Sequence, residues 1–185
     1  WLRPLGILPP VAATGLLYYG LMLLGTFQRQ ERVWIAALDR ARIFALVAVG
    51  LSPFLFWWNR LPNQAFFLLI VELLVFNGFV LLLLLNRVLW RLVAMLPDET
   101  LRLETRLFTT INRYFLVTSI CFLAGYLVLM RIQNFPHRFI EFLVVLNRSS
   151  LWMELFFILL PVATTMAMLW KIKEVILGSV FTPRS

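Results

Sequence analysis

Long apolar blocks separated by short charged clusters are the feature that most constrains the fold of this chain. One block ends in five consecutive leucines, residues 81–85, and runs directly into Asn86 and Arg87. Of the 185 residues, 62% are hydrophobic and only 14% are charged. A soluble domain is about half apolar and about a quarter charged, and its core could not bury so much apolar surface. The sequence therefore predicts an all-α, polytopic integral membrane protein.

Membrane-spanning helices need about 20 mostly apolar residues, and about five blocks meet that length. We expect these spans to form a single transmembrane domain over residues 1–185, with Pro53 kinking the second span. The apolar segment 139–147 is too short to span and is predicted to be interfacial or re-entrant. The predicted spans are 5–27, 41–58, 65–85, 114–130 and 151–170.

The basic residues predict the orientation of the spans. With alternating connections, twelve Lys and Arg residues fall on one side and five on the other. The richer side of a membrane protein faces the cytoplasm. We therefore predict the N-terminus outside, the C-terminus inside, and a location in the bacterial inner (cytoplasmic) membrane. The net charge of +8 forms no basic stripe, so nucleic acid is excluded as a partner, and anionic lipids are expected at the positive side.

Four Asn-Arg pairs recur along the chain, each at or near the edge of an apolar block. Arginine reaches from such an edge to lipid headgroups, and asparagine tolerates a helix end. We interpret the pairs as interfacial anchors rather than a repeated chemical motif. They are Asn59-Arg60, Asn86-Arg87, Asn112-Arg113 and Asn147-Arg148.

The connection 86–113 is predicted to be helical. No Gly or Pro occurs in it before Pro97, and Asp98 can cap a new helix. The simplest arrangement extends the third and fourth spans into the cytoplasm as a helical hairpin. Its two helices could only pack on each other, lie flat among headgroups, or dock a partner subunit. The candidates for docking are Arg87, Arg91, Arg102 and Arg106.

Acidic residues inside spans are rare and indicate function by default. Glu72 and Glu154 both lie toward the predicted outer side. Three interpretations remain open: an ion pair that locks helices together, a proton or cation site, or side chains that reach to the interface. Asn77, near mid-span, is expected to bond to a neighbouring helix.

Small residues on one stripe of the second span predict a helix-packing seam. They recur at intervals of three or four residues: Ala41, Ala45, Ala48 and Ser52. A bend is expected in the fifth span, where Pro161 precedes Thr164 and Thr165.

Catalytic and cofactor motifs are missing from the sequence, so no catalytic, cofactor-binding or metal-binding residues are predicted. Only His137 could serve as an axial ligand. We therefore expect a non-catalytic structural or accessory subunit of a larger membrane complex, in a hetero-complex rather than a homo-oligomer. The alternative is a small transporter or channel component that uses Glu72 and Glu154. A membrane enzyme or cofactor-binding protein is the least favoured reading.

Overall fold

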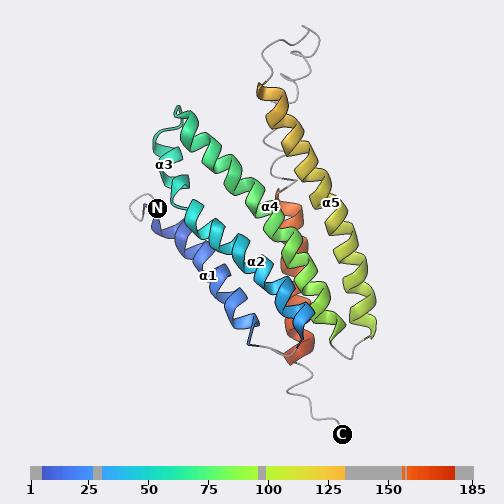
Figure 1. Ribbon diagram of the computed structural model, residues 1–185. Coiled ribbons are helices and arrows are strands. Elements are labelled where there is room, and N and C mark those ends of the chain that lie inside the picture. The colour runs from blue at the N-terminus through green and yellow to red at the C-terminus, as the bar shows by residue number, and fades with distance from the viewer. Residues whose placement is uncertain (1–5, 27–30, 96–98, 132–155, 157, 178–185) are drawn as a thin grey trace. The chain divides into compact units, whose positions relative to one another are not determined.

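The computed structural model describes residues 6–26, 31–95, 99–131, 156 and 158–177, and those residues form helices joined by turns (Figure 1). The all-α prediction is therefore confirmed for this part of the chain. The chain divides into two compact units, Trp1–Leu96 and Pro97–Ser185. The helices are α1 (Leu8–Leu24), α2 (Arg32–Leu51), α3 (Phe54–Arg60), α4 (Ala65–Ala94) and α5 (Glu99–Arg131), followed by a helix over 158–177.

Three helical segments of the described residues are long and apolar enough to cross a membrane: Arg32–Arg60, Ala65–Ala94 and Glu99–Gly125. The α1 helix is apolar but shorter, at 17 residues. These lengths support a membrane location, while the number of five spans stays a prediction. The fifth predicted span lies partly, and segment 139–147 wholly, outside the described residues.

The interruption between α2 and α3 falls at Pro53. Proline has no N–H, so the carbonyl of Val49, four residues earlier, loses its helical donor. The Ser52 hydroxyl donates to that carbonyl at 2.9 Å. One side chain therefore replaces the hydrogen bond that the next residue cannot make, and the apolar segment continues through the break.

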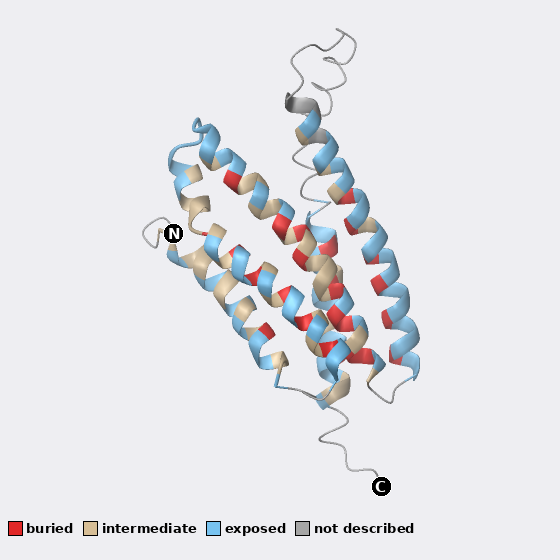
Figure 2. Cartoon of the chain, viewed as in Figure 1, coloured by how far each residue is buried: buried red, intermediate tan, exposed pale blue. Residues whose placement is uncertain are grey.

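The buried face of α2 repeats every three or four residues, which is the spacing of helices that pack nearly antiparallel or parallel. The first two buried positions carry large side chains and the last four carry small ones. Small side chains let helix backbones approach closely, so the predicted seam occupies the C-terminal part of this buried stripe. Figure 2 shows the buried residues of α2 as separate red bands along the helix. The buried positions are Trp34, Leu38, Ala41, Ala45, Ala48 and Ser52.

Within the first unit, α2 packs against α1 on one side and α4 on the other. The α4 helix runs past Asn86 to Ala94 without a break, and α5 runs from Glu99 through Arg113. The connection 86–113 is thus helical wherever it is described. Residues 96–98 lie outside the described part, and the cytoplasmic hairpin stays a prediction.

Two of the Asn-Arg pairs differ from the interpretation given above. Asn86 and Asn112 lie inside uninterrupted helices and are buried, while the arginine that follows each is exposed. In these two pairs the asparagine does not mark a helix end. Its side chain is buried between packed helices. Among the described tryptophans, Trp34 is enclosed completely.

Candidate functional site

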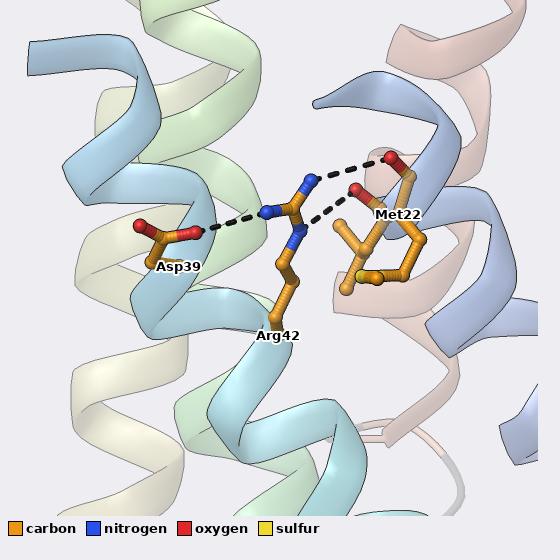
Figure 3. A network of polar contacts seen from close by, with 4 residues as sticks. Met22, Asp39 and Arg42 are labelled. Atoms are coloured by element: carbon orange, nitrogen blue, oxygen red, sulfur yellow. Dashed lines mark hydrogen bonds and ion pairs between the residues drawn. The ribbon is translucent and has the colours of Figure 1, made fainter. Parts of the chain in front are cut away.

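The C-terminal end of α1 is held by an arginine of α2. The last four carbonyls of a helix lack donors from their own helix. Arg42 donates from Nε to the Leu21 carbonyl at 3.2 Å and from Nη2 to the Met22 carbonyl at 3.2 Å (Figure 3). Its Nη1 pairs with Asp39 at 2.9 Å. A cation at this helix end also complements the helix dipole, so the contact fastens α1 to α2.

Gly25 leaves room for this guanidinium. A Cβ atom at Gly25 would overlap Nη2 of Arg42. The backbone of Gly25 has φ −72°, a value that any residue adopts. Gly25 therefore provides space for the guanidinium in this position rather than a special backbone conformation.

Gly25→Ala is expected to displace Arg42 and to lower the free energy of unfolding by about 1–2 kcal/mol, the scale of lost charge-assisted hydrogen bonds. Gly20→Ala is the matched control, because a Cβ atom at Gly20 meets nothing within 4 Å. That change should be neutral or stabilising by up to about 1 kcal/mol. Unfolding in a neutral detergent measures both. Equal stability of the two variants would contradict the role given to Gly25.

Asn77 joins α4 to α2. Its side chain is buried, and Nδ2 donates to the Phe44 carbonyl at 3.0 Å. Ser52 likewise joins α2 to α1, because its Oγ accepts from the Thr14 hydroxyl at 3.2 Å. Both polar groups lie inside apolar helices and bond across a helix interface.

The two acidic candidates are not brought together by the described residues. Glu72 is half-buried in α4 and, within the described part of the chain, has no ion-pair partner. Glu154 lies outside the described residues. A shared role of these two carboxyl groups in an ion path stays a prediction.

The second unit has its own polar contact, which involves Asn112 of α5. Asn112 donates from Nδ2 to the Thr165 hydroxyl at 3.2 Å and accepts from the Thr164 hydroxyl at 3.1 Å. The same two hydroxyls lie 2.9 and 2.7 Å from the Pro161 carbonyl. Glu104 also forms an ion pair with Lys171. These contacts show that α5 and the helix over 158–177 pack antiparallel.

A pocket of about 280 Å³ opens between α2 and α4. Four arginines line it, two from each helix, and no acidic residue does. The rest of the lining is aliphatic. The arginines are Arg32, Arg40, Arg87 and Arg91, and the aliphatic residues are Val33, Ala36, Ala37 and Leu84.

Two of the four arginines that line this pocket were among the residues predicted from the sequence. Arg87 and Arg91 were predicted to contact a partner, but Arg32 and Arg40 were not singled out. A signal was available in the sequence: positions 87 and 91 are one helical turn apart, and 32 and 40 are about two turns apart on one face. Both pairs also fall on the predicted positive side, at ends of antiparallel neighbours.

The other docking candidates, Arg102 and Arg106, lie exposed near the start of α5. Among the described residues, no group of His, Cys, Asp or Glu side chains could hold a metal ion. No family model, curated protein or solved structure matches the chain.

Proposed function

We propose that the chain is a non-catalytic accessory subunit of a larger membrane protein complex. This proposal rests on one observation: polar side chains inside the helices form hydrogen bonds to neighbouring helices. Asn77, Ser52 and Asn112 each hydrogen-bond to a neighbouring helix. Interhelical hydrogen bonds of this kind stabilise helix packing. Polar groups engaged in packing favour a structural role over a reaction.

The start of α5 supports a docking role. Leu103 and Leu107 are exposed at 69% and 62% and lie beside the exposed Arg102 and Arg106. A helix that faces only water carries polar residues on its exposed face. Exposed leucines next to arginines are typical of a surface that contacts a partner or lipid.

Extraction from the native membrane in a gentle detergent tests the proposal. We expect the chain to migrate in a large hetero-complex on native gels, with partners identified by mass spectrometry. A monomer or a homo-oligomer would contradict the proposal and favour transport. The accompanying orientation has the N-terminus outside and the C-terminus in the cytoplasm, which a reporter fused to the C-terminus checks.

Reversal of both charges on α5, Arg102→Glu with Arg106→Glu, is expected to release the partner on native gels. Like charges placed against a complementary surface cost several kcal/mol. Arg87→Glu with Arg91→Glu makes the same reversal at the same spacing on α4. This second variant shows whether α4 shares the docking surface. Unchanged migration of the α5 variant would argue against docking through that helix.

A further inference from the structure

We propose that the pocket between α2 and α4 binds the phosphate-bearing headgroup of an anionic phospholipid. The proposal does not depend on the accessory-subunit function, because the pocket lies wholly within the first unit. Three features of the pocket support a lipid headgroup: the charge of its lining, the ordering of one arginine, and its depth along α4.

The charge of the lining calls for an anion. Four arginines line one pocket, and no acidic residue is in its lining. Asp39 lies between Arg32 and Arg40 in the sequence, but its carboxylate pairs with Arg42, which is outside the pocket lining. Like charges held close together repel one another. Guanidinium groups bind phosphate oxygens through paired hydrogen bonds, so a phosphate is the anion that best fits four arginines.

One of the four arginines is held in place by a neighbour. The Arg91 guanidinium lies 4.9 Å from the centre of the Trp90 ring. A cation over an aromatic ring is attracted to it, and a side chain that is already ordered loses less entropy on binding. Trp90 is itself exposed at 40%, as tryptophans in a headgroup region are.

The depth of the pocket favours a lipid over a soluble phosphate. The apolar stretch 65–85 of α4 spans about 31 Å at the helical rise, close to the roughly 30 Å hydrocarbon core. Leu84 of the pocket lies at the end of that stretch, and Arg87 and Arg91 follow it. The aliphatic side chains of Ala36, Ala37 and Leu84 then lie where a headgroup joins its acyl chains. A volume of about 280 Å³ is near the lower end for small-molecule sites, which suits a headgroup.

Lipid retention by the full chain in a neutral detergent tests the proposal. Native mass spectrometry counts the bound molecules during titration with phosphatidylglycerol or phosphatidylcholine. We expect one phosphatidylglycerol to bind at least about tenfold more tightly than phosphatidylcholine, since each arginine near anionic lipid contributes measurably. Equal affinity for the two lipids would overturn the proposal, whatever the variants do.

Arg40→Gln with Arg87→Gln removes one cation from each helix and is expected to weaken phosphatidylglycerol binding at least about tenfold. Both positions are exposed, so helix packing should survive; size-exclusion chromatography and circular dichroism check this. Arg106→Gln with Arg113→Gln is the matched control, because both arginines are exposed on α5 and outside the pocket. An equal loss in the control would mean that overall charge, rather than the pocket, selects the lipid.

Sodium phosphate distinguishes the two sources of a phosphate group. If the pocket lies at the level of the lipid headgroups, we expect millimolar inorganic phosphate to leave the bound phosphatidylglycerol in place. Displacement of the lipid, with stabilisation of the lipid-free chain by phosphate alone, would overturn the lipid assignment and make the pocket a site for a soluble phosphate.

Discussion

We expect Trp34→Ala to lower the free energy of unfolding by about 3–5 kcal/mol, the range for truncating a fully buried aromatic side chain. Trp34 has an exposed fraction of 0%, and it is the largest of the completely enclosed side chains in the described residues. The truncation removes its apolar contacts and leaves a cavity that rigid helices fill only in part. Chemical unfolding of the purified chain in a neutral detergent measures the change.

Trp170→Ala is the control for Trp34→Ala. Trp170 is exposed at 66%, and Nζ of Lys173 lies 4.0 Å from the centre of its ring. An exposed contact of this type is worth about 0.5–1 kcal/mol, so the control should lose no more than that. If both variants lost the same stability, the burial of Trp34 would have no energetic consequence and the packing of α2 would need revision.

Ala45→Phe is expected to lower the free energy of unfolding by about 1–3 kcal/mol, because added volume in a packed interface forces side chains off their rotamers or helices apart. Ala45 lies in the middle of the small-residue part of the α2 stripe and has an exposed fraction of 0%. The neighbouring positions Ala41 and Ala48 are also small and buried, so no adjacent side chain can shrink to accept the ring.

Leu46→Phe adds a ring at the next residue of the same helix and serves as the control for Ala45→Phe. Leu46 is exposed at 55%, so its replacement should change stability by no more than about 0.5 kcal/mol. Unfolding of both variants under the same conditions gives the comparison. Tolerance of the ring at position 45 equal to that at 46 would show that the small residues do not form a close helix contact.

The helical class and many of the helix boundaries could be predicted, because they depend on local features of the sequence. These features are the length of each apolar block and the positions of the prolines. Pro53 interrupts the second apolar segment whatever surrounds it. The start of α2 was harder to predict. The charged residues 28–44 allow either an in-plane turn or an extension of the second span. The structure has a helical extension, because α2 begins at Arg32 and its charges and apolar residues fall on different faces of one helix.

Pairings between helices could not be read from the sequence, because they depend on the rotation of each helix about its axis. The position of Asn77 within an apolar span predicts a bond to a neighbouring helix, but it does not reveal that the acceptor is the Phe44 carbonyl. The convergence of Arg32 and Arg40 with Arg87 and Arg91 likewise required the antiparallel packing of α2 on α4. Side-chain type indicated which residues were candidates, and tertiary structure decided which of them met.

The arginine that fastens α1 bears on the order in which the protein matures during synthesis. Met22 and its guanidinium donor Arg42 are 20 residues apart, so a ribosome working at about 5–20 residues per second makes the second about 1–4 s after the first. Until then, the Leu21 and Met22 carbonyls lack the side-chain donor that Arg42 supplies in the finished fold. The end of α1 therefore reaches its final set of hydrogen bonds only after α2 has been made, and we expect the first two helices to mature as a pair.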